Sequence, residues 1–530
     1  MSAGVSQISL AALTPAPKPV AHAVCVGKDV LELLAGSMYV DPLNIYREYI
    51  QNAADSIDEA RDSGLQFEDG VPGVQIFFNQ LERTIRIRDN GTAIPAAECV
   101  ARLTSIGASQ KRGKQLRGFR GVGRLSGLGY CQELIFRSRA EGDAKVIEVR
   151  WNGRALREKM RDPNYVGNLS ELVQDIVTET RLPGTGYPNR FFEVELRKVV
   201  RSRNDILLNE DAVRSYISQV APVPFSDQFS YANEIDATLN EYGLRPPIHI
   251  ELMDGRGPVF HRVTDQFPVS ESSVDTISDV EFVEILDADG AVSAFGWIAH
   301  HAYSGSLPKK LGLAGIRLRV GNIQIGDESI LAPLFPEARF CGWAIGDIHI
   351  LSSKIVPNGR RDDFEQNAAF SHFQSEMTMR ARRITSLIRE HSAQRNQLRS
   401  VQLHCGAVEQ WLTAVNTRKI PHIVAGALQD IVRERLAGAA KEAQRLALGS
   451  EQLLLTTEQL DLLTERVENL SLPARAQETK GPFEGTALEK PITTVIKTIL
   501  LAAKTPDAGL DLTLQVVQAL ESPQASGSAL

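Results

Sequence analysis

The sequence predicts an α+β protein with an N-terminal α/β sandwich, a mixed α/β middle domain and a mainly helical C-terminal region. Three observations predict this class. A stretch at 44–60 in which apolar residues recur with helical spacing precedes a strand-like alternation at 83–94. Alternating runs return between about 245 and 356, such as Ile248–Leu252 and Ala314–Val320. After Asp362 the pattern is helical and charged through about Leu470.

Length and composition describe an ordinary globular chain. Its 530 residues correspond to about three domains of roughly 150 residues each, and 43% hydrophobic content allows real cores. The net charge of −7 gives no overall basic field for nucleic acid or an anionic membrane, although a local patch remains open. The odd number of scattered cysteines fits reduced thiols, so a cytoplasmic location is expected: Cys25, Cys99, Cys131, Cys341 and Cys405.

The predicted boundaries follow changes in composition. Residues 1–23 are rich in Ala, Ser and Pro and lack the pattern of a signal peptide, so they are expected to form a flexible arm. The run Ile492–Ala503 is interrupted by Lys497 and is too short for a bilayer, so no membrane partner is expected. The predicted parts are the arm at 1–23, the sandwich domain at 24–200, a connecting helix and middle domain at 201–364, a helical domain at 365–472, and a linker, short helix and polar tail at 473–530.

The predicted helix at 44–60 carries the first candidate site. Glu48 and Asn52 are one turn apart, so their side chains share a helix face, and Asp55 and Glu59 continue that stripe. A carboxylate can accept a proton from water, and a carboxamide oxygen is a hard ligand for Mg²⁺. The alternative for this face taken alone is a solvated polar stripe.

Three weaker motifs follow in a fixed order. The alternating strand ends in Asp89-Asn90-Gly91, which by itself is commonly only a turn. A segment at 103–111 leads into a glycine cluster at 118–129. The sequence Pro183-Gly-Thr-Gly186 then precedes the strand-like run Phe191–Leu196.

This order of motifs resembles the Bergerat-fold (GHKL) ATPases, which include gyrase, the HtpG chaperone, histidine kinases and MutL. The heat shock protein 90 (HtpG) branch is favoured because Lys28–Tyr39 supplies the lead-in helix of that branch. The resemblance implies a Bergerat-type ATP-binding domain with ATP and Mg²⁺ as cofactors, and slow hydrolysis of ATP to ADP and phosphate.

The resemblance also implies a role for each matching residue. Glu48 would be the general base that orients water, and Asn52 would ligate Mg²⁺. Asp89 would accept a hydrogen bond from the adenine amino group, with Gly91 allowing the base to approach the backbone. Thr185 would support the contact between Asp89 and adenine, through water.

The glycine cluster would form the lid over the phosphates. Backbone N–H groups around it would cradle phosphate, and Lys111 would add a charge or belong to an exposed basic loop. The predicted nucleotide-binding residues besides those above are Asp55, Ile94, Lys111, Gly118, Gly121, Val122 and Gly123. One departure from the family pattern is Ala93, which stands where Asp-x-Gly-x-Gly has its second glycine, and altered loop geometry is expected there rather than lost binding.

Competing phosphate and metal motifs fail on spacing. The stretch from Gly107 to Lys114 has one residue too many for a P-loop, and Gln115 stands where a Ser or Thr should ligate Mg²⁺. Ser126 occupies the third glycine position of a dinucleotide fingerprint. Neither His-Glu-x-x-His nor a paired Cys-x-x-Cys occurs, so no zinc site is predicted.

The end of the middle domain carries the second signal. Gly346–Asp362 is predicted as a strand followed by a turn, and it resembles the loop by which the chaperone's middle domain sends an arginine to the γ-phosphate. Arg361 matches that arginine best, and Arg360 is an alternative for the same role. Lys354 is the third candidate, because gyrase and MutL use a lysine from their second domain. An arginine pair whose following acids, Asp362-Asp363, cap the next helix is the alternative.

Two classes of function remain. The first is an ATP-driven machine of the chaperone type, in which lid closure and homodimerisation act on a protein client or partner. The second is a nucleotide-gated binding module of a signalling or defence assembly, and a MutL- or gyrase-like role on DNA is less favoured by the acidic charge. Apolar residues with helical spacing would either pair two copies or pack within their own domain: Leu453, Leu460, Leu463 and Val467.

Overall fold

The computed structural model describes residues 27–28, 41–67, 70–106, 123–201, 204–271, 273–416, 420–445, 451–468, 483 and 485–521. The chain divides into two compact units, Met1–Arg382 and Arg383–Leu530. The predicted arm at 1–23 and nearly all of the predicted lead-in helix lie outside the described residues.

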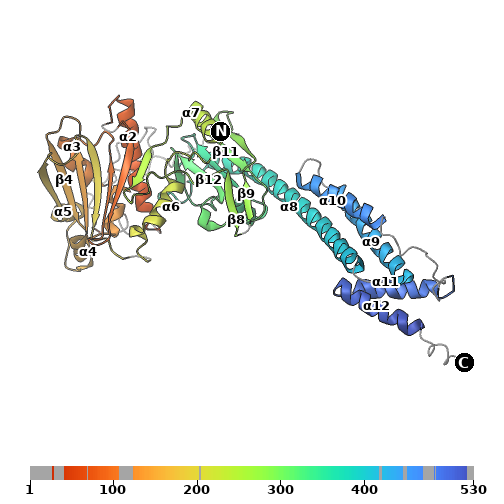
Figure 1. The fold of residues 1–530 in the computed structure, drawn as a ribbon. Coiled ribbons are helices and arrows are strands. Elements are labelled where there is room, and N and C mark those ends of the chain that lie inside the picture. Colours follow the sequence, from red (N-terminus) through yellow and green to blue (C-terminus); the bar gives the residue numbers. More distant parts are fainter. Residues whose placement is uncertain are drawn as a thin grey trace, which may run out of the picture. The chain divides into compact units, whose positions relative to one another are not determined.

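A seven-stranded sheet organises the N-terminal part of the first unit (Figure 1). Its strands lie in the order β5-β4-β3-β6-β2-β1-β7. Its strands are β1 (Gly73–Asn79), β2 (Thr84–Asp89), β3 (Glu133–Arg139), β4 (Lys145–Asn152), β5 (Val177–Pro183), β6 (Phe191–Arg197) and β7 (His249–Leu252). Neighbouring strands are antiparallel except β1 and β7, which are parallel. The sheet therefore includes a strand from beyond residue 200, where the sandwich domain was predicted to end.

Helices cover one face of this sheet because its strands alternate. Ile85 and Ile87 of β2 point into the core, whereas Arg86 and Arg88 point to the other face. The helices of the N-terminal part that join this core are α2 (Asn44–Asp62), α3 (Ala96–Thr104), α4 (Gly153–Arg161) and α5 (Leu169–Ile176). On the opposite face, Arg137 forms ion pairs with three carboxylates of neighbouring strands, those of Glu148, Glu193 and Glu195. The result is the two-layer α/β sandwich that the sequence predicts.

The predicted connection and middle domain form the rest of the first unit. A short 3-10 turn at Ile206–Leu208 leads into α6 (Glu210–Val220) and then α7 (Ala232–Glu241). A five-stranded sheet follows in the order β10-β11-β14-β12-β13, with a separate β8–β9 hairpin. These strands are β8 (Gln266–Ser270), β9 (Ser273–Thr276), β10 (Asp279–Leu286), β11 (Val292–His300), β12 (Gly315–Val320), β13 (Ile323–Ile325) and β14 (Ile345–Ile350).

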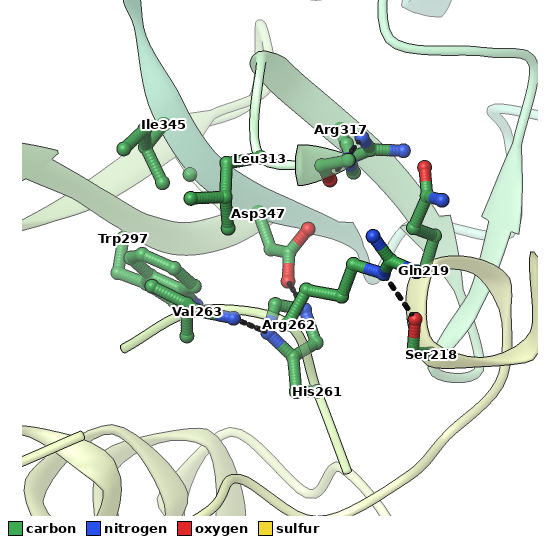
Figure 2. A pocket seen from close by; sticks show the side chains of 12 residues that line it. Ser218, Gln219, His261, Arg262, Val263, Trp297, Leu313, Arg317, Ile345 and Asp347 are labelled. Atoms are coloured by element: carbon green, nitrogen blue, oxygen red, sulfur yellow. Dashed lines mark hydrogen bonds and ion pairs between the residues drawn. The ribbon is translucent and has the colours of Figure 1, made fainter. Parts of the chain in front are cut away.

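A buried polar cluster joins α6 to the middle sheet beside a small cavity (Figure 2). The Asp347 carboxylate on β14 lies 3.2 Å from Nε2 of His261 and 3.0 Å from Nε of Arg319. Arg319 also donates to the carbonyl of Gln219 at the end of α6, at 2.7 Å. Its guanidinium holds the pKa of Asp347 well below the usual range, while burial lowers the pKa of neighbouring His349 to about 3. The cluster therefore fixes β14, which leads to the Arg361 loop, against the connecting helix.

The second unit is helical, in agreement with the predicted fold class. The helices are α8 (Ala368–Asn416), which begins in the first unit, α9 (His422–Ala443), α10 (Glu451–Glu468), α11 (Glu489–Ala502) and α12 (Pro506–Glu521). Leu460, Leu463 and Val467 of α10 are buried in the core of this unit, so these residues pack inside their own domain rather than face a second copy. The C-terminal part contains two helices where one short helix and a polar tail were predicted. None of the helices within the described ranges has the length and apolar character needed to cross a membrane.

Candidate active site

Helix α2 places Glu48 and Asn52 in the centre of the N-terminal sandwich. Most of its other side chains are buried in the core, and the Tyr46 hydroxyl donates to the carbonyl of Leu207 at 2.6 Å. Glu48 is only 5% exposed, and its Oε1 has no hydrogen-bond partner among the described residues. A buried carboxylate oxygen that lacks a donor is suited to receive a water molecule.

Glycine at position 123 permits the close approach of Glu48 to the backbone. Gly123 begins a 3-10 helix, Gly123–Gly129, and a Cβ at this residue would collide with the Glu48 carboxylate. The Tyr49 hydroxyl accepts from Gly127 N–H at 3.0 Å and so ties this helix to α2. The predicted lid residues Lys111, Gly118, Gly121 and Val122 lie outside the described residues.

The predicted metal ligand is available for that role. Asn52 is half-buried, and no hydrogen bond from a described residue occupies its carboxamide. Asp55, one turn further along α2, is 3% exposed. The described residues contain no cluster of three His, Cys, Asp or Glu side chains that would hold a metal by itself. A carboxamide without such a hydrogen bond is compatible with the predicted role of Asn52 as a single protein ligand to Mg²⁺, and that role stays a prediction.

The predicted adenine carboxylate lies at the end of β2. Asp89 is 5% exposed and accepts a hydrogen bond from Gly91 N–H at 3.0 Å. Burial raises the pKa of Asp89 to about 7, and the Gly91 N–H and the nearby Ser56 hydroxyl oppose the shift. Ser56 is on α2, one turn after Asn52, and the sequence analysis did not identify it.

Gly91 is required by helix α2 itself. A Cβ at Gly91 would collide with the Ser56 side chain and lie 2.6 Å from the Ser56 carbonyl carbon, and the next residue, Thr92, donates its N–H to the Ser56 carbonyl at 3.1 Å. The loop after β2 is therefore pressed against α2, and only glycine fits there.

The residue that replaces the second family glycine adopts a glycine-like conformation. Ala93 has φ +60° and is 8% exposed. The following residue, Ile94, exchanges two hydrogen bonds of 2.8 Å with the Ser138 hydroxyl, one through its N–H and one through its carbonyl. Alanine therefore keeps the left-handed turn that glycine would adopt, at the usual cost of that region for a residue with a Cβ.

We expect Ala93→Gly to leave thermal stability and ATP affinity nearly unchanged, because glycine adopts a positive φ freely. Ala93→Val should lower the free energy of unfolding by at least about 2 kcal/mol, because a β-branched side chain at positive φ is strained and the site has no spare volume. Thermal and denaturant unfolding of the two variants checks this contrast. Equal stability of the valine and glycine variants would contradict it.

Arg190 holds the same loop and was missed by the sequence analysis. It is 6% exposed, and its Nε donates to the Gly91 carbonyl at 2.9 Å. One Nη donates to the Gln66 carbonyl at 2.7 Å, and the other pairs with Glu141 at 3.0 Å. Thr185 is exposed in the turn before β6, and its role beside Asp89 stays a prediction.

The middle domain brings one of the three candidate cations to Glu48. Arg361 is 8% exposed, and its Nε lies 3.9 Å from Glu48 Oε1. Arg47, beside Glu48 on α2, donates to the carbonyls of Arg361 at 3.3 Å and Arg360 at 3.1 Å. Lys354 instead pairs with Asp289 at 3.1 Å, on the turn between β10 and β11.

The acidic pair after Arg361 closes the loop rather than capping a helix. Asp362 accepts from the Asn358 side chain at 2.6 Å, and the Asp363 carbonyl accepts from Asn358 N–H at 2.8 Å. The first turn of α8 is capped by Asn367, whose side chain accepts from Phe370 N–H at 2.9 Å. The alternative in which Asp362 and Asp363 cap the next helix is therefore wrong.

Comparisons with known proteins agree with this geometry. Residues 45–176 match the family model of histidine kinase-, DNA gyrase B- and HSP90-like ATPases. The chaperone protein HtpG of Polaromonas naphthalenivorans is 32% identical over 139 residues, 23% of this chain and 22% of that protein. HtpG of Photorhabdus laumondii is 29% identical over 226 residues, which are 39% of this chain and 31% of that protein. HtpG of Yersinia enterocolitica is 29% identical over 233 residues, which are 41% of this chain and 33% of that protein.

The matched part spans a third or less of the length of these curated relatives. It includes α2 with Glu48 and Asn52 and the end of β2 with Asp89. Residues 45–176 are therefore similar to the ATPase domains of the histidine kinase-, DNA gyrase B- and HSP90-like (GHKL) family, and the curated relatives are HtpG chaperones.

Proposed function

We propose that the chain is a Mg²⁺-dependent ATPase of the heat shock protein 90 type, in which ATP binding controls protein association and hydrolysis is slow. The single observation that supports this most strongly is the meeting of two groups from different domains. Glu48 of α2 and Arg361 of the middle-domain loop lie within 3.9 Å of each other, and both are buried. A carboxylate base beside a guanidinium is a pair that can support phosphoryl transfer to water, because one group activates the water and the other stabilises phosphoryl charge.

Each group has a separate task in this proposal. Asp89 accepts a hydrogen bond from the adenine amino group and so orients the nucleotide. Glu48 accepts a proton from the attacking water through the oxygen that lacks a donor. Arg361 stabilises the negative charge that develops on the phosphoryl oxygens. Mg²⁺, held by Asn52, supplies further neutralisation of phosphate charge when bound.

The purified chain tests the proposal directly. Incubation with ATP and Mg²⁺ should release phosphate slowly, and the release should stop when Mg²⁺ is chelated. A protein that neither binds nor hydrolyses ATP would overturn the proposal.

Oligomeric state separates the two classes of function. A chaperone-type machine should form a homodimer at least with a non-hydrolysable ATP analogue, as measured by light scattering. A strict monomer with and without nucleotide would instead favour the gated binding module.

ATP affinity should rise with pH because of Asp89. The amino group of adenine donates to the ionised carboxylate, and burial raises the pKa of that carboxylate to about 7. ATP must therefore displace a proton at lower pH, and its affinity should be roughly tenfold weaker at about pH 6 than at about pH 8. Calorimetry with adenosine as a second ligand checks the assignment, because adenosine has no phosphate that titrates in this range.

The same group affects stability with the opposite sign. The pKa of Asp89 is raised in the folded protein, so the ionised carboxylate disfavours the fold, and its contribution makes the nucleotide-free protein less stable as pH rises from about 4 to about 7.

An ATP or adenosine affinity that does not change between pH 6 and pH 8 would contradict the proposed contact between Asp89 and adenine.

A further inference from the structure

Helix α2 carries a buried carboxamide that none of the roles above uses. Gln51 is 1% exposed, and its Oε1 accepts a hydrogen bond from Nη1 of Arg361. It is three residues after Glu48, so the two side chains lie on neighbouring parts of one helix face. Burial of a long polar side chain on a mainly apolar helix is costly unless a partner is present, and here the partner comes from the middle domain.

The backbone of the Arg361 loop is fixed by contacts that do not involve Gln51. Pro357 and Phe364 form a bridge across the base of the loop. The carbonyl of Arg361 accepts from Gly326 N–H at 2.9 Å and from Arg47 Nη1 at 3.3 Å. Arg361 itself has φ +59°, a conformation that this web of hydrogen bonds holds. These contacts place the loop, but they leave the direction of the guanidinium to be decided by its own partners.

We propose that Gln51 is a positioning residue, whose neutral carboxamide aims the Arg361 guanidinium at the reacting phosphate beside Glu48. This inference rests on the function proposed above. The carboxamide accepts a hydrogen bond but has no charge, so the guanidinium keeps its positive charge for the phosphoryl oxygens. A carboxylate in the same place would form a stronger, charge-assisted pair and would compete with the phosphate for the guanidinium.

Two substitutions separate an effect on the orientation of the Arg361 guanidinium from an effect on packing. Gln51→Ala removes the acceptor, and turnover should fall roughly 10–100-fold because the guanidinium is no longer held in the productive geometry. Gln51→Glu keeps the shape and the hydrogen bond, so the thermal midpoint should be equal to or above that of the wild type, while turnover still falls at least about tenfold. ATP affinity should stay within about twofold in both variants, because Asp89 and Asn52 are unchanged.

The middle domain offers a matched control. Ser293 of β11 is 2% exposed, and its hydroxyl donates to the carbonyl of Ile285 at 3.0 Å, within the five-stranded sheet. Ser293→Ala removes a buried hydrogen bond that does not involve the Arg361 loop, so it should lower the thermal midpoint and leave turnover per folded molecule within about twofold. A loss of turnover that merely followed the loss of stability would appear in this control as well.

A background variant tests the proposed route of action. In an Arg361→Ala protein, Gln51→Ala should have no further effect on turnover, because residues that act as a unit are not additive. Wild-type turnover by Gln51→Ala or by Gln51→Glu, or a full additional loss in the Arg361→Ala background, would overturn the role of Gln51. A wild-type protein without any turnover would instead show that the proposed function is wrong, and the role of Gln51 would fall with it.

Discussion

Replacement of Glu48 by alanine is expected to preserve ATP binding and to lower turnover by roughly 10²–10⁴-fold, the effect of a positioned general base. The reason is that Glu48 is a buried carboxylate with one oxygen that has no hydrogen-bond donor, whereas the groups proposed to bind adenine and Mg²⁺ are Asp89 and Asn52. Single-turnover phosphate release and calorimetric ATP binding, measured on the same preparation, give the two quantities.

Stability must be separated from chemistry in this experiment. Glu48 lies 3.6 Å from Arg47 and 3.9 Å from Arg361, so removal of its charge leaves two buried guanidinium groups without that carboxylate. Glu48→Gln keeps the volume and is the better variant if the alanine protein unfolds. Glu59→Ala, an exposed carboxylate near the end of the same helix, is the matched control and should retain turnover. Near-normal hydrolysis by Glu48→Gln would remove Glu48 from the mechanism.

A binding-competent Glu48 variant also addresses the unknown partner. If ATP binding drives association, a protein that binds ATP and does not hydrolyse it should accumulate in the associated state. Light scattering of Glu48→Gln with ATP should then match that of the wild type with a non-hydrolysable analogue. A pull-down with this variant is the most direct way to find a client.

Replacement of Asp89 by asparagine is expected to abolish measurable ATP binding, with a loss of affinity of at least about 100-fold. The Asp89 carboxylate accepts from Gly91 N–H and lies near the Ser56 hydroxyl, and the adenine amino group would be a further donor. Asparagine has one acceptor oxygen where aspartate has two, and its NH₂ group cannot accept a hydrogen bond from adenine. The fold should survive, because the asparagine oxygen can still accept from Gly91 N–H.

Nucleotide selection follows from the same contact. GTP presents a carbonyl where ATP presents an amino group, so Asp89 would face an acceptor and affinity for GTP should be far weaker. Asp143→Asn is a matched control, since this carboxylate accepts from the N–H groups of Ala96 and Ala140, both at 3.1 Å, on a neighbouring loop. That variant should bind ATP normally. Equal affinities of the wild type for ATP and GTP would contradict the assignment of Asp89.

The sequence by itself determined the fold class and the identity of the nucleotide domain. Helical spacing predicts Glu48 and Asn52 on one face of α2, and period-two alternation predicts that Ile85 and Ile87 of β2 point away from Arg86 and Arg88. These features are local, because a helix or a strand fixes which of its own residues share a face. The order of the motifs then sufficed to recognise the ATPase family.

Contacts between distant segments were decided only by the tertiary structure. Ser56 and Arg190 gave no sequence signal, because a serine on a helix and an arginine before a strand are common and their partners lie elsewhere in the chain. Arg361 was one of three candidate cations, and the loop geometry places it, rather than Lys354, at Glu48. The stripe on α10 had two interpretations, and packing buries Leu460, Leu463 and Val467 within their own unit, while the side chain of Leu453 lies outside the described residues. Sequence patterns carry the preferences of each element, whereas a site formed by several elements depends on which faces meet when the core closes.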